Sequence, residues 1–308
     1  MKKITSVILI SFIVLMLSVV FIGCSSSDSK TNSNNDTNKT SDKTNDNGKT
    51  NDGGKTNDGD KTDDSGNNGG SQSGDDNYLA FKYSFDDTNK TAIISEYTKD
   101  ENKVVIPSIA FEYTVVGIGE NAFARKALSE VTIPDTVTRI GSSAFNGCAN
   151  LKIVRIPSSV TYIGGKCFEN CTALENFIIP NSVTEIGYRC FQGCTALSAI
   201  LISNSLTEIP DGLFSGCESL RTITVPEGVT LIDTFAFVNC KVLKNIVIPD
   251  SVTEFGEKAF YHCNQLSEIH YSGSISDWDN LSKGRLWNDD CPAVITIHCA
   301  NGDTEVTN

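Results

Sequence analysis

The sequence predicts a repeat solenoid in which short parallel strands and short helical turns stack in register. Three observations predict it: a Phe recurs every 23 residues, a Cys follows three residues after each Phe, and a Leu follows three residues after each Cys. A 23-residue unit cannot bury its own apolar face, so the copies must stack, and equivalent residues then form ladders. The predicted ladder consists of Phe145, Cys148, Leu151, Phe168, Cys171, Leu174, Phe191, Cys194, Leu197, Phe214, Cys217, Leu220, Phe237, Cys240, Leu243, Phe260, Cys263 and Leu266.

Each part of the unit V-T-x-I-G-x-x-A-F-x-x-C-x-x-L-x-x-I-x-I-P-x-S predicts a local structure. The I-x-I-P part alternates with period two and ends in proline, which favours a short strand. The A-F-x-x-C-x-x-L part has apolar residues at spacings of three, which favours one or two tight helical turns. A degenerate first copy carries Phe123 and Leu128 without a cysteine. We expect Phe123 to have fewer stacked neighbours than Phe191 in the central copy.

The glycine of the unit is typical of a turn. It is present in four copies, at Gly141, Gly164, Gly187 and Gly256, whereas Pro210 and Asp233 take the same position in two others. Proline cannot adopt a positive φ, so a left-handed backbone at this position is not obligatory.

The cysteines could form a metal or redox site, or they could simply pack in the core. Cys190 and Cys194 are four residues apart, which in a helix would place both thiols on one face, as in a metal site or a redox pair. Cys167 and Cys190, however, take the slot that alanine fills in other copies, and a free cysteine behaves as a small buried hydrophobe. The chain has three histidines and no C-x-x-C pair. We therefore expect packing, with no metal site and no cofactor. Disulfides stay an open alternative: an exported chain meets oxidising conditions and ladder cysteines fall within bridging distance, although parallel Cβ vectors disfavour them.

Residues 1–24 form a targeting segment with two lysines, a long apolar run and a terminal Gly23-Cys24. The run is also long enough for an uncleaved membrane anchor. Phe21-Ile22-Gly23-Cys24 resembles the lipobox of bacterial lipoproteins, although that family usually has Leu where this chain has Phe21. The resemblance implies cleavage before Cys24 and lipidation of Cys24, and with it an exported protein held at the outer face of a bacterial membrane.

Residues 25–77 predict a disordered spacer. The tract is nearly free of apolar side chains, carries 11 Asp against 6 Lys, and repeats units such as KTNDGG with a period of six. Such a composition cannot offset the entropy of ordering the chain. A flexible chain of this length spans on the order of 40 Å, enough to lift a domain off a membrane surface.

Residues 78–308 carry the fold, and the recurring A-F-x-x-C-x-x-L-x-x-I-x-I-P string resembles the BspA-like, Treponema-type leucine-rich repeat of bacterial surface proteins. The resemblance implies a hairpin cap over residues 78–103, with strands around Asp86–Lys90, then repeats over residues 104–275. A terminal strand cap and tail over residues 276–308 would follow. The copy centred on Phe214 departs most, because Ser203 replaces a proline and Pro210 a glycine. Membership implies surface display and binding, with no catalytic residues to carry over.

The residues themselves favour a binding module over an enzyme. No nucleophile–base–acid set or phosphate loop stands out, and His262, His270 and His298 all fall in the last copy and cap. After residue 77 the chain has 27 acidic against 17 basic residues, which makes nucleic acid an unsuitable partner. We expect adhesion or protein recognition outside the cell, through an extracellular or cell-surface protein ligand. The alternative is a structural envelope scaffold without a specific ligand.

The middle residue of each I-x-I strand predicts the ligand-binding face. Its neighbours face inward, so it points outward, and three members of the row are aliphatic where a purely solvated face would favour polar side chains. Tyr162 and Leu231, from the V-T-x-I segment, are candidates to extend it. The alternative is that aliphatic residues simply suit strands. The row consists of Thr132, Arg155, Ile178, Leu201, Thr224, Val247 and His270.

Overall fold

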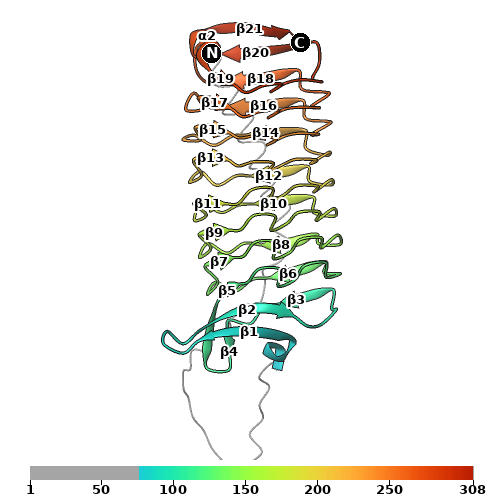
Figure 1. The fold of residues 1–308 in the computed structure, drawn as a ribbon, viewed down its shortest axis with the longest axis vertical. Helices are drawn as coiled ribbons and strands as arrows, with labels where there is room; N and C mark the ends of the chain where they lie inside the picture. The colour runs from blue at the N-terminus through green and yellow to red at the C-terminus, as the bar shows by residue number, and fades with distance from the viewer. Residues whose placement is uncertain (1–75, 308) are drawn as a thin grey trace, which may run out of the picture. The chain divides into compact units, whose positions relative to one another are not determined.

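The computed structural model describes residues 76–307, which form stacked turns of short parallel strands with almost no helix (Figure 1). The predicted solenoid class is confirmed. Across residues 76–307 no helix is both long and apolar enough to cross a membrane. The predicted targeting segment, Cys24 and all but the last two residues of the predicted spacer lie outside the described residues.

The N-terminal cap is a short 3-10 helix and an antiparallel hairpin. Helix η1 (Asp76–Ala80) takes in the last two residues assigned to the spacer and leads into β1 (Phe81–Asp86), which pairs with β2 (Thr91–Tyr97). Strand β2 in turn pairs in parallel with β5 (Tyr113–Ile118), which also carries the short antiparallel β4 (Ile109–Ala110). The hairpin therefore covers the first turn of the solenoid: β2 pairs with β5 on one side and with β1 on the other. Less strand edge is left exposed at this end as a result.

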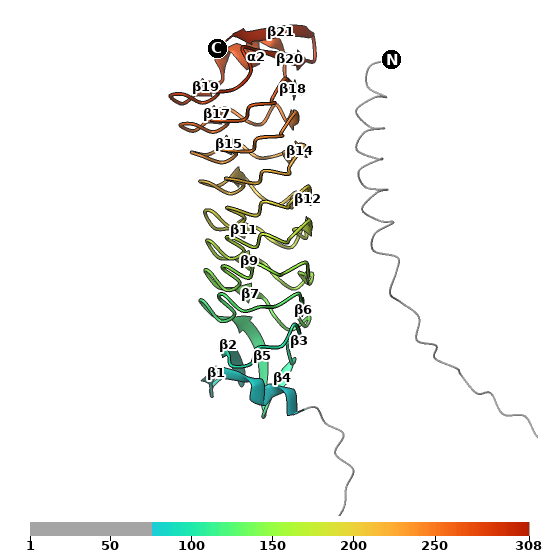
Figure 2. The same ribbon diagram turned by 90° about the vertical axis from the view of Figure 1, so that its right-hand side faces the viewer.

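Two columns of strands run along the solenoid, and each turn contributes one strand to each column (Figures 1 and 2). The V-T-x-I parts form the first column, after β5: β7 (Arg139–Ile140), β9 (Tyr162–Ile163), β11 (Glu185–Ile186), β13 (Glu208–Ile209), β15 (Leu231–Ile232), β17 (Glu254–Phe255) and β19 (Ser282–Lys283). The I-x-I parts form the second: β3 (Lys103–Val105), β6 (Glu130–Thr132), β8 (Ile153–Arg155), β10 (Asn176–Ile178), β12 (Ala199–Leu201), β14 (Thr222–Thr224), β16 (Asn245–Ile248), β18 (Glu268–Tyr271) and β20 (Val294–Cys299).

The C-terminal end is closed by an antiparallel strand and a buried tryptophan. Strand β21 (Gly302–Thr307) pairs with β20, so the last parallel strand has no free edge. The only α-helix among residues 76–307, α2 (Ile275–Asn280), begins at Ser274 with a capping box to Asp277 and buries Trp278. The solenoid core is thus covered at both ends.

The segments between the two columns are consecutive tight turns and not a continuous helix. Amides of alternate residues bond locally, as from Ala144 to Gly141 and from Cys148 to Phe145. The intervening amides donate to the next copy instead, as from Phe145 to the Cys167 oxygen at 2.9 Å. Ser143 and Gly147, whose own amides also donate to the next copy, have a left-handed backbone. The spacing of three therefore reflects single turns, and half of their amides hold neighbouring copies together.

The repeat glycine serves close approach rather than a left-handed backbone. None of the four, Gly141, Gly164, Gly187 and Gly256, has a positive φ. A Cβ added at Gly187 would overlap the main chain of Gly165 in the preceding copy, with 2.5 Å to its Cα atom, and the other three would meet main-chain atoms in the same way. The glycine removes the atom that would keep the copies apart.

The copy that departs most from the repeat interrupts the first column but not the core. Amides of Gly187 and Asp233 each donate to the isoleucine carbonyl of the preceding copy at 2.8–2.9 Å, whereas Pro210 has no amide hydrogen to give. The sheet accordingly ends at β11 and a new one begins at β13. Phe191 and Phe214 still stack across this point, with ring centroids 5.9 Å apart.

Candidate functional site

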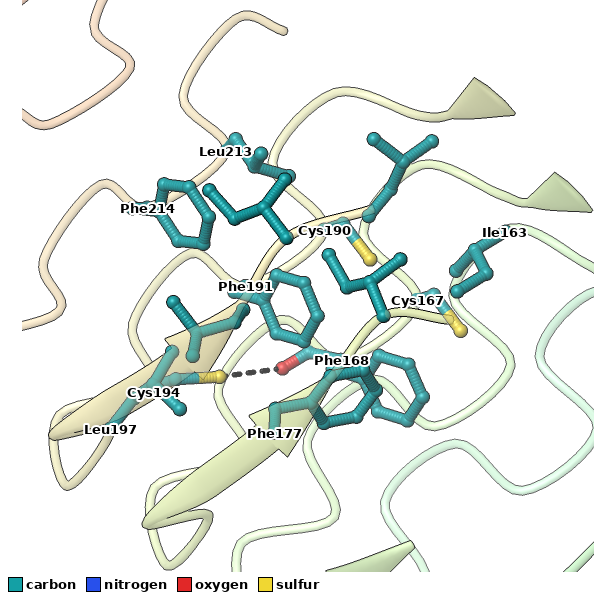
Figure 3. Packing of buried hydrophobic residues seen from close by; sticks show 14 of the residues in the cluster. Ile163, Cys167, Phe168, Phe177, Cys190, Phe191, Cys194, Leu197, Leu213 and Phe214 are labelled. Atoms are coloured by element: carbon teal, nitrogen blue, oxygen red, sulfur yellow. Dashed lines mark hydrogen bonds between the residues drawn. The ribbon is translucent and has the colours of Figure 1, made fainter. Parts of the chain in front are cut away.

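The cysteine column is the first candidate for chemistry, and its surroundings are those of a core. Each Sγ lies 3.0–3.3 Å from the main-chain oxygen of the Phe in the preceding copy, as from Cys194 to Phe168 (Figure 3). The thiol donates a weak hydrogen bond there, which couples each turn to the one before it. The six column members predicted from the repeat are fully buried: Cys148, Cys171, Cys194, Cys217, Cys240 and Cys263.

The thiols are free throughout residues 76–307, and burial makes all of them unreactive except Cys291 and Cys299, which are only partly buried. Burial raises the pKa of Cys148 to about 11 and that of Cys194 further still. Cys167 and Cys190 lie side by side in the slot that alanine fills elsewhere, and burial also raises the pKa of Cys167 (Figure 3). Because the thiolate is the nucleophile and the metal ligand, these side chains act as packing groups.

Sequence reasoning missed one member of this column. Cys291 donates to the Phe260 oxygen at 3.2 Å, as the other column cysteines do to their Phe partners. Its spacing from Cys263 is longer than one repeat unit, because the cap adds residues to the last turn. The signal that could have found it is Trp287, four residues earlier, which closes the aromatic stack against Phe260 with ring centroids 6.0 Å apart.

The second candidate is the outer strand face, defined here as the outward residues of the second column of strands. Val131 and Ile133 are buried while Thr132 between them is exposed, and the same alternation recurs in later copies. The strand register aligns Thr132 with Arg155, Ile178 with Leu201, and Thr224 with Val247. The predicted row is therefore aligned within each of three short sheets, and these sheets follow one another along the second column. Its role in binding stays a prediction.

The apolar members of this row differ in exposure. Ile178 is 37% exposed, whereas Leu201 and Val247 are half-buried between their neighbours. The row is a set of partly covered aliphatic groups with Ile178 as its most open aliphatic member, and not a uniform exposed stripe.

Two exposed aliphatic residues on the same face escaped the sequence analysis. Ile153, the first residue of β8, is 55% exposed, and Val105 of β3 is 59% exposed and pairs with Thr132. Val105 lies in the string Val104-Val105-Ile106-Pro107, which matches the I-x-I-P pattern. Its separation from Thr132 along the chain is longer than one repeat unit, and this irregular spacing hid it. Together with Ile178 and Arg155 these residues form an exposed group in the N-terminal half of the face, and Val294 of β20, 45% exposed, is the exposed aliphatic residue at its C-terminal end.

Tyr162 and Leu231 do not extend this face. They belong to β9 and β15 in the first column of strands, where they align with Arg139, Glu185 and Glu254. The Arg139 guanidinium lies over the Tyr162 ring at 4.1 Å from its centroid. The idea that they continue the I-x-I row is wrong, because the two parts of the unit feed separate sheets.

A shallow depression lies beside the central strands of the outer strand face. The residues that precede β10, β12 and β14 line it, with Glu175 and Glu218 supplying carboxylates and Arg221 a guanidinium. Lys241 is paired with Glu218 at 2.7 Å. Charged side chains therefore border the row on this side, as a polar rim borders the apolar centre of many protein interfaces.

Comparisons with known proteins agree with this architecture. The model of the BspA type leucine rich repeat region matches residues 92–220 and 184–282, in six copies, which is more than half of the chain. The crystal structure of the Treponema pallidum leucine-rich repeat protein is similar, with 28% identity and a TM-score of 0.57 over 61% of this chain and 88% of that one.

A leucine-rich repeat protein from Bacteroides ovatus is 30% identical over 67% of this chain and 66% of that one, with a TM-score of 0.47. A leucine rich cell surface protein from Faecalibacterium prausnitzii is 24% identical over 66% of this chain and 96% of that one, with a TM-score of 0.33. Curated proteins gave no match. With the repeat, the strand register and the family model in agreement, the chain belongs to the BspA-type leucine-rich repeat family.

Proposed function

We propose that this protein is a surface-anchored bacterial lipoprotein whose repeat domain binds a protein ligand outside the cell. The observation that supports binding best is the outer strand face: Ile153 and Arg155 on β8 and Ile178 on β10 lie on successive strands of the second column and are all exposed (Figure 1). Exposed aliphatic groups beside a guanidinium suit a partner protein, since interfaces combine apolar contact with arginine. Repeat solenoids commonly bind along such extended faces. No catalytic step is part of this proposal.

The proposed ligand-binding residues are Arg155, Ile178, Leu201, Thr224 and Val247, with Val105 and Ile153 added from the structure. A partner that covers them would bury aliphatic groups in the centre and place an acidic side chain opposite Arg155. The excess of acidic over basic residues in the domain argues against nucleic acid as that partner.

Anchoring rests on the sequence before the described residues. The apolar run ending in Gly23-Cys24 supports lipidation, and the polar tract after it supports display at a distance from the membrane. Metabolic labelling with a fatty acid should mark the wild-type protein, and Cys24→Ala should abolish the label. Release of unlabelled mature protein from wild-type cells would overturn the anchor.

Ligand binding is tested separately, by site-specific photo-crosslinking on intact cells. A photoreactive amino acid at Ile178 should trap a discrete extracellular protein, and the same group at Tyr188, which is exposed but outside the outer strand face, should not. Equal trapping at both positions, or none at Ile178, would favour the alternative of a structural envelope scaffold.

A further inference from the structure

Two of the three histidines come together at the C-terminal end of the outer strand face. His270 on β18 and His298 on β20 are register partners in a parallel pair, so both side chains leave the sheet on the same side. Their rings are stacked, with centroids 4.7 Å apart and planes 18° from parallel. Their spacing along the chain is longer than one repeat unit, which is why the repeat pattern does not reveal this pairing.

A carboxylate from the same face completes a cluster. Glu268 is two residues before His270 on β18, and its Oε2 lies 3.6 Å from the His270 Nε2 atom. One ligand atom from each of Glu268, His270 and His298 lies within 4.8 Å of the other two. All three side chains are half-buried, so each is held by its neighbours yet reachable from solvent.

From this cluster we propose a binding site for a divalent transition-metal ion of the zinc class, with an imidazole nitrogen from each histidine and a Glu268 carboxylate oxygen as ligands. Two imidazoles and a carboxylate are a donor set that suits Zn²⁺. In a tetrahedral zinc site neighbouring donor atoms are about 3.4 Å apart, given metal–ligand distances near 2.0–2.1 Å. The donor atoms now lie within 4.8 Å of one another, so a bound ion would draw them together by side-chain rotation.

Asp303 supplies a carboxylate that can hold the imidazole of His298 in the orientation needed to bind a metal. It faces His298 across the antiparallel β20–β21 pair, and its Oδ1 lies 3.2 Å from the His298 Nδ1 atom. A proton held on Nδ1 by this carboxylate leaves the lone pair of Nε2 free for the metal, as in carboxylate–histidine–zinc arrangements. With three protein ligands, the fourth position of the ion is open to water or to a group of a partner.

Calorimetric titration of the full-length protein in detergent with Zn²⁺ at neutral pH tests the site. The wild type should bind one Zn²⁺ that depends on these residues. His270→Gln, His298→Gln and Glu268→Gln should each lower the affinity at least tenfold, and Asp303→Asn should lower it about 10–100-fold. His262→Gln is the matched control, because this third histidine of residues 76–307 pairs with Asp290 outside the cluster and should leave the affinity unchanged.

A cysteine thiol could bind Zn²⁺ instead of the histidines, and two measurements distinguish thiol ligation from histidine ligation. Cys299→Ser should bind Zn²⁺ as the wild type does, and the Co²⁺-loaded protein should lack a thiolate charge-transfer band. Circular dichroism and thermal melting of each variant establish that it is folded. If a histidine variant does not fold, Glu268→Gln tests the site in its place. Wild-type affinity in His270→Gln and His298→Gln, equal loss in His262→Gln, or loss in Cys299→Ser would each overturn the proposal.

Discussion

The thiol of Cys194 lies 3.1 Å from the main-chain oxygen of Phe168 in the preceding turn, deep in the core (Figure 3). Cys190, four residues earlier in the same copy, is equally buried but takes the alanine slot of the repeat. The two side chains have the same volume, but Cys194 bonds to the main chain whereas Cys190 contacts the Cys167 thiol.

Cys194→Ala should therefore destabilise the domain more than Cys190→Ala. Both changes remove one buried sulfur atom, but only the first also removes the link to the Phe168 carbonyl. We expect a loss of about 2 kcal/mol in the free energy of unfolding for Cys194→Ala and about 1 kcal/mol for Cys190→Ala. Urea denaturation under reducing conditions measures both, and a larger loss for Cys190→Ala would contradict the role of the hydrogen bond.

The aromatic column gives a second prediction that differs from the one based on the repeat alone. Phe191→Ala should cost roughly 3–5 kcal/mol, the range for truncating a buried aromatic residue. Phe123 is not a free end of the stack, because Tyr97 covers it at a centroid distance of 5.3 Å and Phe145 lies beyond it at 5.0 Å. Phe123→Ala should thus cost about as much as Phe191→Ala. If equilibrium unfolding shows a much smaller loss at Phe123, the hairpin cap does not hold the stack.

Close approach of the copies gives a third prediction. Gly187→Ala places a methyl group against the main chain of Gly165, which cannot move without separating the two turns. We expect a loss of about 3 kcal/mol or more, at the upper end for overpacking. Gly117→Ala is the control, because its new methyl group would meet the Ile93 side chain first, at 3.4 Å, and should change stability by less than about 1 kcal/mol. Similar melting temperatures for the two variants would contradict this explanation of the repeat glycine.

The buried thiols predict a loss of stability at alkaline pH. Burial raises the pKa of Cys148 from its usual 9.0 to about 11, so between these values the unfolded chain loses a proton that the folded chain keeps. Its contribution is fully present below pH 9 and is lost as the pH rises toward 11, at about 1.4 kcal/mol per pH unit for a fully shifted thiol. The denaturation midpoint should fall over this range, and Cys148→Ala should make the fall shallower by about one proton. An identical slope in wild type and variant would rule out this contribution.

The regular period of the repeat was sufficient to predict the fold, because ladders of identical residues allow one way of stacking. It predicted tight turns in the A-F-x-x-C-x-x-L part but not their left-handed residues, since positions such as Ser143 and Phe235 carry no glycine signal. Nor could it place residues where the period changes. Val105 before the first regular copy and His298 after the last one join the outer strand face through cap geometry that no spacing in the repeat encodes.

The candidate site was predictable in outline and not in detail. Alternation along the I-x-I strand is enough to say which residue points outward. How far Leu201 and Val247 are covered depends on the side chains of the copies above and below, which differ from turn to turn. The exposed centre of the face therefore lies nearer Ile153 and Ile178 than the composition of the row alone suggested.

Binding of a partner to the outer strand face is tested by the adhesion of cells that display a triple variant. Changing Ile178, Leu201 and Val247 to Ser should lower binding to the target cells or immobilised extracellular proteins at least tenfold. Far-UV circular dichroism should remain that of the parent, with melting reduced by only a few degrees. The control changes Tyr162, Tyr188 and Leu231, which lie outside this face, to Ser and should bind as the parent does. Parental adhesion by the folded first variant, or equal loss in the control, would place the binding site outside this face.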